Sequence, residues 1–240
     1  MNELRRVHIA CDDVQRAAQV YSTIAGTGAV AGDRTTVIPV GSAEIVLARS
    51  KAEQLSGVVG VDITVDSVAD RIGPLASVGI EAADFGDQSH FGLSGLDVSI
   101  SEEAPADPVH ATAHLDHVAV VIQDLGTGSA QWEAATGVDA HHMGLHPISN
   151  GTFSASRIVL GEAMMELISP TPGVASAVAS RLAAIGEGPA AVAIPVDDVD
   201  ACREALEAIG ARVIRSDPHW MVHPKDAAGV LVQITPRVRH

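Results

Sequence analysis

The sequence predicts an α+β protein built from four successive β-α-β-β-β units. A segment that reads strand, acidic or amide cap, helix and glycine recurs four times along the 240 residues. Short runs in which apolar and polar residues alternate, typical of half-buried strands, follow each helix. The composition, 47% hydrophobic and 19% charged, indicates a globular chain with material for one large domain or two ordinary ones.

The clearest copies of the recurring segment are RRVHIACDDVQRAAQVYSTIAG at 5–26 and DHVAVVIQDLGTGSAQWEAATG at 116–137. In each copy an apolar strand is followed by a cap, Asp12 and Asp13 in the first and Asp124 in the second. Such carboxylates accept hydrogen bonds from the free amides of the first helical turn. Each predicted helix then stops at a glycine.

Two further copies are GVDITVDSVADRIGPLASVGIEA at 60–82 and AVAIPVDDVDACREALEAIGARV at 191–213. Both read strand, acidic cap, helix and glycine, and Gly79 and Gly210 fit left-handed helix C-caps. The remaining strands are predicted at TTVIPV, AEIVLA, FSASRIVL, AMMELIS and GVLVQIT.

The four units fall into two halves. The offset between corresponding positions grows from roughly 111 residues at the first strand to roughly 134 at the last, which fits insertions near HHMGLHPISNG and SPTPGVASAVAS. The segment EEAPADPVHATAH is typical of a linker. We therefore expect a first domain at 1–104, a linker at 105–113 and a second domain at 114–240. The alternative is an ordinary alternation of strands and helices without a repeat.

Charge and composition restrict the partners. A net charge of −15 without any run of Lys or Arg disfavours nucleic acid and anionic membranes, and 2% aromatic residues disfavour base stacking. The chain has no apolar run long enough to cross a bilayer and does not begin like a signal peptide. Its two cysteines, Cys11 and Cys202, indicate neither a disulfide framework nor a thiolate zinc site. We expect a cytoplasmic protein with a small-molecule partner.

The strings LDHVAVVIQDL, MMELISP, AVAIPVDDVDACREALEAIGARVI and HPKDAAGVLVQI resemble the vicinal oxygen chelate superfamily, also called the glyoxalase/bleomycin resistance/dioxygenase family. The second half, about 112–236, looks most like the methylmalonyl-CoA epimerases. The first half matches only in its strand and helix rhythm. The resemblance implies that the β-α-β-β-β units pair to form two open barrels, each around a ligand cavity that often holds a divalent metal. Pairing within one chain and pairing across a homodimer both occur in the family.

The resemblance also implies where the metal ligands would lie. His117, Glu166, Ala191 and Gln233 occupy the four ligand positions. Alanine cannot bind a metal, and a neutral amide is a weaker ligand than a carboxylate. One divalent metal (Zn, Ni, Co, Fe or Mn) and a metal-free site are both compatible with this set. The matching positions of the first half carry no such set: Arg6, Val46, Gly60 and Ser99.

Other residues could complete the site. His219, just before the HPKD string, is a candidate replacement for the missing histidine ligand, against the alternative of a surface histidine. Without a metal, His117 and Glu166 could act as a general base pair. Arg157 could hold an anionic group of the substrate, unless it simply faces solvent. The position of the second acid of the epimerases falls near Ser154, which cannot do that work unaided.

These residues predict an enzyme that acts on a small oxygenated metabolite in the cavity of the second half. The expected chemistry is that of an isomerase, epimerase or lyase, with proton transfer through an enolate-like intermediate. One alternative is a metal-free binding protein of the bleomycin-resistance type, and another is an extradiol-type dioxygenase. All of these readings require His117, Glu166 and Gln233 to converge from separate strands.

Overall fold

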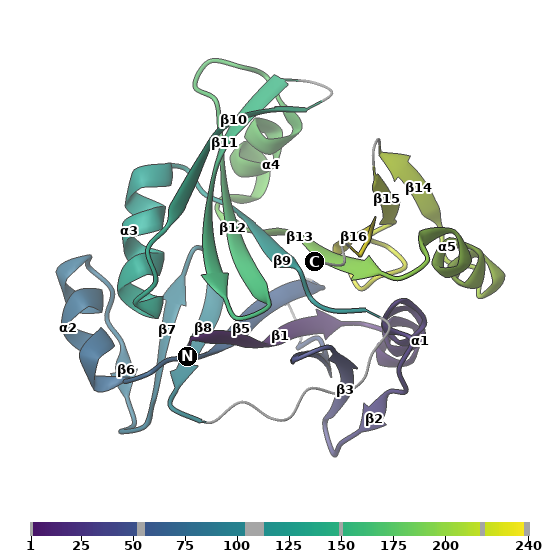
Figure 1. Ribbon diagram of the computed structural model, residues 1–240, viewed down its shortest axis with the longest axis horizontal. Coiled ribbons are helices and arrows are strands. Elements are labelled where there is room, and N and C mark those ends of the chain that lie inside the picture. The colour runs from purple at the N-terminus through teal and green to yellow at the C-terminus, as the bar shows by residue number, and fades with distance from the viewer. Residues whose placement is uncertain (1, 52–55, 104–112, 149–150, 217–218, 238–240) are drawn as a thin grey trace. The chain divides into compact units, whose positions relative to one another are not determined.

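A computed structural model describes residues 2–51, 56–103, 113–148, 151–216 and 219–237 (Figure 1). It contains the four predicted β-α-β-β-β modules, so the α+β fold expected from the sequence is confirmed. No helix in the described ranges is both long enough and apolar enough to cross a membrane. The predicted linker at 105–113 lies almost wholly outside the described residues, and the predicted domain boundaries stay a prediction.

The modules follow one another along the chain. The first two consist of β1 (Glu3–Cys11), α1 (Val14–Ala25), β2 (Val30–Ala31), β3 (Thr35–Val40), β4 (Ala43–Arg49), then β5 (Gly57–Thr64), α2 (Ala69–Ser77), β6 (Ala83–Asp84), β7 (Gln88–Leu93) and β8 (Leu96–Ser101). The last two consist of β9 (His117–Val121), α3 (Leu125–Thr136), β10 (His141–Ile148), β11 (Gly151–Leu160), β12 (Ala163–Pro170), then β13 (Gly188–Val196), α5 (Val199–Ala208), β14 (Val213–Ser216), β15 (His219–Val222) and β16 (Leu231–Pro236). An additional helix, α4 (Ala177–Ile185), precedes the fourth module.

All four modules share one strand order. The orders are β2-β3-β4-β1, β6-β7-β8-β5, β10-β11-β12-β9 and β14-β15-β16-β13. The first strand runs parallel to the last in the first and fourth modules, because the helix carries the chain back before the antiparallel meander begins. Side chains alternate between the two faces of each sheet, which explains the period-two pattern of the sequence.

The acidic caps are confirmed at three of the four module helices. Asp13, Asp124 and Asp198 each accept a hydrogen bond from the amide three residues later. This bond lowers the pKa of the Asp124 carboxyl. The expected acidic cap of α2 is wrong: the Val68 amide donates to Glu102 Oε1 at 2.7 Å instead. Gly79 and Gly210 have the positive φ expected after α2 and α5.

The modules group into two compact units. Unit 1 contains Val61–Ala104 and Val118–Ala190, together with the N-terminal residues up to Leu4. Unit 2 contains Arg5–Gly60, Pro105–His117 and Ala191–His240. Unit 1 therefore holds most of the second and third modules and unit 2 most of the first and fourth.

Each unit is held by a buried aromatic side chain at the same position of the repeat. In unit 1, Trp132 of α3 is fully buried and donates its indole N–H to Ser94 Oγ at 3.2 Å. In unit 2, Tyr21 of α1 is fully buried and donates its hydroxyl to Ala227 O at 3.3 Å. Burial raises the pKa of Tyr21, so its hydroxyl stays a donor. Each ring thus ties the helix of one module to the last turn of another.

The turns that receive these rings are also repeated. Ser94 and Ala228 are the two non-glycine residues with positive φ in the described chain, and a glycine with positive φ, Gly95 or Gly229, follows each. A Cβ on Gly95 would lie 2.6 Å from Glu187 O, and one on Gly229 would overlap the carbonyl of Ser56. The backbone therefore needs glycine at both positions, for conformation and for space.

We predict that Gly95→Ala lowers the free energy of unfolding by about 2 kcal/mol or more, because the new methyl adds left-handed strain to a clash with Glu187. Gly92→Ala is the matched control, since a Cβ there meets nothing within 4 Å and its φ is ordinary. Urea denaturation of the two variants gives the comparison. Equal stability of the two variants would refute this account of the contact between Gly95 and Glu187.

Candidate functional site

Arg157 and Glu166, two of the predicted site residues, form an ion pair in unit 1. They are direct cross-strand partners on β11 and β12, so their side chains leave the sheet on the same face. Arg157 Nε and Nη2 both donate to Glu166 Oε1, at 2.9 and 2.8 Å. The Glu166 side chain is 14% exposed and that of Arg157 36%. No other partner of this guanidinium lies among the described residues, which leaves further N–H groups to donate.

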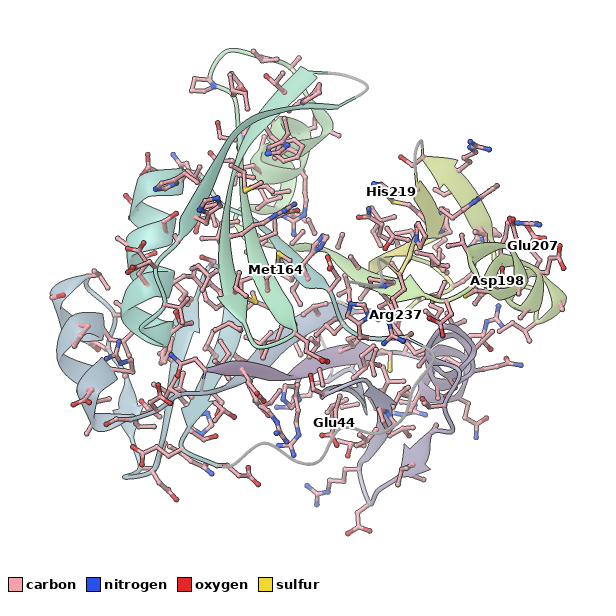
Figure 2. The ribbon with its side chains drawn as sticks, in the orientation of Figure 1. Glu44, Met164, Asp198, Glu207, His219 and Arg237 are labelled. Atoms are coloured by element: carbon pink, nitrogen blue, oxygen red, sulfur yellow. The ribbon has the colours of Figure 1, made fainter. Side chains whose placement is uncertain are left out.

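The sheet face that carries this ion pair has different neighbours on the two sides of the pair. On one side of the pair lies Val159 opposite Met164, near the β11–β12 turn where Figure 2 labels Met164. On the other side lies Ala155 opposite Ile168, which form an apolar cluster with Val121. Two residues of α4, Val178 and Leu182, pack against this cluster together with Met143, Phe153 and Ala190. The ion pair therefore borders an apolar region that α4 covers.

His117, in unit 2, is oriented by a carboxylate that the sequence analysis did not single out. His117 Nδ1 lies 2.6 Å from Asp116 Oδ2, and the imidazole is 12% exposed. Because an ionised carboxylate only accepts a hydrogen bond, this contact needs the proton on Nδ1. An Asp directly before the ligand-position His is the signal that could have revealed this pair.

The strand register puts the remaining predicted residues of unit 2 on the same face of their sheet. The Asp116 amide donates to Ala193 O at 3.0 Å, and Ala193 is the parallel partner of Gln233. Gln233 is in turn the partner of Met221 on β15, and His219 lies two residues from Met221 on the same face. Figure 2 shows His219 on the side of the β14–β15 hairpin away from α5. Ala191 shares this face with Ala193 because the two are also two residues apart.

The opposite face of β16 packs in the core. Val232 and Ile234 are buried, whereas Gln233 between them is half-buried. The HPKD loop before β16 is fixed by Asp226, which accepts from Arg212 Nε at 2.7 Å. The Arg212 guanidinium holds the pKa of the Asp226 carboxyl below its usual value. Gln233 therefore lies on the half-buried face of a strand whose other face packs in the core.

The donor set does not fit a divalent metal. Ala191 offers no ligand, Gln233 offers a neutral amide, and Glu166 Oε1 already accepts two bonds from a guanidinium whose charge opposes a cation. In the described ranges, no three His, Cys, Asp or Glu residues gather as a group that could hold a metal ion. His219 lies on the face of Gln233, and its role as a replacement ligand stays a prediction.

The predicted site residues thus fall into two groups. Arg157 and Glu166 form one pair, and His117 of β9 and Gln233 of β16 lie on either side of β13. Ser154 pairs with Leu145 and Ser169 across its sheet. The convergence of the two groups on one substrate stays a prediction. In the first half, Arg6 pairs with Glu44 at 2.7 Å and Val46 is buried.

Comparison with known proteins supports the resemblance. Residues 115–232 match the family model of the glyoxalase-like domain. A mutant of 4-hydroxymandelate synthase from Streptomyces coelicolor has the same fold, with a TM-score of 0.71 over 99% of this chain and 93% of that chain at 16% identity. Methylmalonyl-CoA epimerase from Mycobacterium tuberculosis aligns over 52% of this chain and 88% of its own, at 24% identity and a TM-score of 0.44. No curated protein matches this chain.

We predict that the Arg157–Glu166 pair contributes about 1 kcal/mol of coupling energy, because the carboxylate is largely shielded from water. A double-mutant cycle of Arg157→Ala, Glu166→Gln and both together, followed by urea denaturation, measures this coupling. Additive effects of the two substitutions would contradict the pairing.

Proposed function

We propose that the protein, whose residues 115–232 match the family model of the glyoxalase-like domain, moves a proton on a small oxygenated metabolite. The reaction class is that of an isomerase, epimerase or lyase, in which a carbon acid next to a carbonyl group loses its proton. The residues proposed to take part fall in two groups, His117 and Gln233 of unit 2 and Arg157 and Glu166 of unit 1.

The observation that carries this proposal is the Asp116–His117 pair. A carboxylate at 2.6 Å from Nδ1 stabilises the imidazolium that forms when Nε2 takes up a proton. The ring is held almost out of solvent, which preserves its orientation. This arrangement is typical of a general base that accepts a proton and returns it.

Gln233 supplies a neutral side chain on β16. This strand pairs with β13, to which the Asp116 amide is hydrogen-bonded. The side-chain N–H of Gln233 can donate to the oxygen on which negative charge develops when a proton leaves the neighbouring carbon. A neutral donor suits that oxygen and brings no charge that would need a partner in a half-buried place. In this role the amide is an advantage, although as a metal ligand it would be weak.

Arg157 and Glu166 would bind the substrate's polar end. The guanidinium keeps N–H groups beyond those bound to Glu166, and its planar geometry suits a carboxylate. Glu166 is the residue at the family's second ligand position, and here its charge is balanced by Arg157. We therefore propose metal-independent proton transfer.

A binding protein of the bleomycin-resistance type is the second candidate. Ala191 at one family ligand position and Gln233 at another favour it, because both remove metal ligands. This candidate shares the substrate-binding residues but does not use His117 as a base.

We predict that His117→Ala slows proton exchange about a hundredfold or more, since general acid–base catalysis contributes that much. The measurement is deuterium wash-in at the carbon next to the carbonyl of short 2-oxo acids, followed by nuclear magnetic resonance. Asp116→Asn should give a smaller loss and a changed pH profile, because the ring keeps its place but loses the charge that stabilises its protonated form. Full exchange activity in His117→Ala would eliminate the dyad as the base.

We predict that chelation of metals leaves the wild-type exchange rate unchanged and that purified protein contains less than stoichiometric metal. Elemental analysis before and after dialysis against a chelator tests both points. Stoichiometric iron would instead favour an oxygenase, and stoichiometric zinc, nickel, cobalt or manganese a metal-dependent isomerase or lyase. His219→Ala is the companion variant, since loss of any such metal in it would identify His219 as a ligand.

A further inference from the structure

We propose that a cavity beside α4 binds a small primary ammonium compound with an apolar body. The cavity lies wholly within unit 1, and none of the residues of the proposed reaction lines it. The inference therefore does not depend on the proposed function.

The cavity has a volume of about 580 Å³ and is bordered by the β12–α4 loop, by α4 and by the loop after α4. This volume is in the range of small-molecule sites in proteins. Its walls are mostly apolar and include Pro170, Pro172, Val174, Ala179 and Leu182. A small apolar ring that lies against these walls gains free energy in proportion to the area that leaves water.

The walls of the cavity are held in place by their own hydrogen bonds. The Val174 amide donates to Thr171 O at 3.1 Å and closes a turn in which Gly173 has a φ of 74°. Glycine suits the third position of such a turn because it adopts a positive φ without strain. Ser176 then caps α4 by accepting from the Ala179 amide at 3.1 Å. Because the cavity is formed before a ligand arrives, binding does not have to order it.

Glu187 is the charged residue among the described residues that line the cavity. Its Oε1 accepts from the Gln123 amide at 2.8 Å, and its backbone carbonyl packs against the turn at Gly95. No Lys or Arg in the described ranges forms an ion pair with this carboxylate. The carboxylate is therefore oriented by one oxygen, and the other oxygen can accept from a ligand.

The end of α4 adds to the preference for a cation. The last carbonyl groups of a helix have no intrahelical partner and carry the negative end of the helix dipole. Ala183 of the last turn lines the cavity, and this turn contains no basic residue. Arg181, one turn earlier, donates to Gly186 O and Pro189 O at 3.1 and 2.6 Å and does not line the cavity. An ammonium group has three N–H donors, so it can bond to Glu187 and to a carbonyl oxygen together.

The charge of the whole chain favours the same class of ligand. A net charge of −15 attracts cations and repels anions at long range. An anion with the same apolar body would also meet the Glu187 carboxylate, whereas a neutral compound would gain only the apolar contact. We therefore expect affinity to fall from the ammonium compound to the neutral compound to the anion.

The test is the binding of benzylamine, benzyl alcohol and benzoate to the whole protein at pH 7, followed through the amide signals in nuclear magnetic resonance. These compounds share one ring and differ in charge. Benzylamine should bind about fivefold more tightly than benzyl alcohol, since an exposed ion pair and a helix end each contribute modestly. Benzoate should bind most weakly of the three. The amides of Gln123 and Val174 should shift when benzylamine is added.

Glu187→Gln tests the charged group. The new side chain still offers an oxygen to the Gln123 amide, but its negative charge is gone. This variant should bind benzyl alcohol like the wild type and lose the preference for benzylamine. Glu133→Gln is the matched control, because Glu133 Oε1 accepts the Ala140 amide at 2.8 Å and lies outside the cavity. It removes the same charge from unit 1 and should keep the preference.

Ala179→Leu tests the apolar wall, because the larger side chain fills the cavity. It should weaken benzylamine and benzyl alcohol alike, by about fivefold or more. Ala184→Leu is its control, since Ala184 is an exposed residue of the same helix outside the cavity. Circular dichroism checks that each variant folds, and Glu187→Gln decides the matter if Ala179→Leu does not.

Four results would overturn the inference. They are the absence of benzylamine binding, equal binding of the three ring compounds, shifts that leave out the Gln123 and Val174 amides, and an unchanged preference for benzylamine in Glu187→Gln. Loss of the preference in Glu133→Gln as well would show that the charge of the whole protein, and not this cavity, selects the ligand.

Discussion

The fold depends on one kind of contact between two modules, which occurs once in each unit. A fully buried aromatic donor on a helix, Trp132 in one unit and Tyr21 in the other, reaches the last turn of a different module. Next to each aromatic side chain a glycine packs against the backbone that precedes another strand. Gly95 packs against Glu187 before β13, and Gly229 packs against Ser56 before β5. Burying a large ring with its polar atom satisfied combines a substantial hydrophobic gain with a directional bond. Each of these contacts joins the helix of one module to the last turn of another.

Two of the residues expected at metal-ligand positions contact charged side chains of this chain, and a third is a neutral amide. Glu166 still lies on β12, but its carboxylate is bound by Arg157 from β11. Gln233 still lies half-buried between two core residues of β16. His117 retains a carboxylate at Nδ1, which orients a ring for proton transfer as well as for a metal. The Glu166 carboxylate is therefore balanced by Arg157, and the His117 ring is oriented by Asp116.

Much of this fold could be predicted from the sequence, because its signals are local. The runs TTVIPV and FSASRIVL lie within β3 and β11, and Asp13, Asp124 and Asp198 cap the helices as expected. The contact of Glu102 with the start of α2 could not be foreseen, since Glu102 follows β8, 34 residues beyond Val68. The helix α4 was read only as an insertion, because its Ala-rich sequence has a weak apolar period. The pairing of Glu166 with Arg157 also escaped notice, since a pairing between strands depends on register and not on spacing.

The repeated contact between modules has a consequence for the half of the chain whose positions Arg6, Val46, Gly60 and Ser99 cannot bind a metal. Trp132 belongs to the second half and Ser94 to the first, while Tyr21 belongs to the first and Ala227 to the second. Each half therefore completes the interior of the other. A chain without its first half would lack Ser94, the partner of the Trp132 indole, and would also lack Tyr21, which packs on the turn at Ala227. The first half therefore has a structural part in the interior of both units.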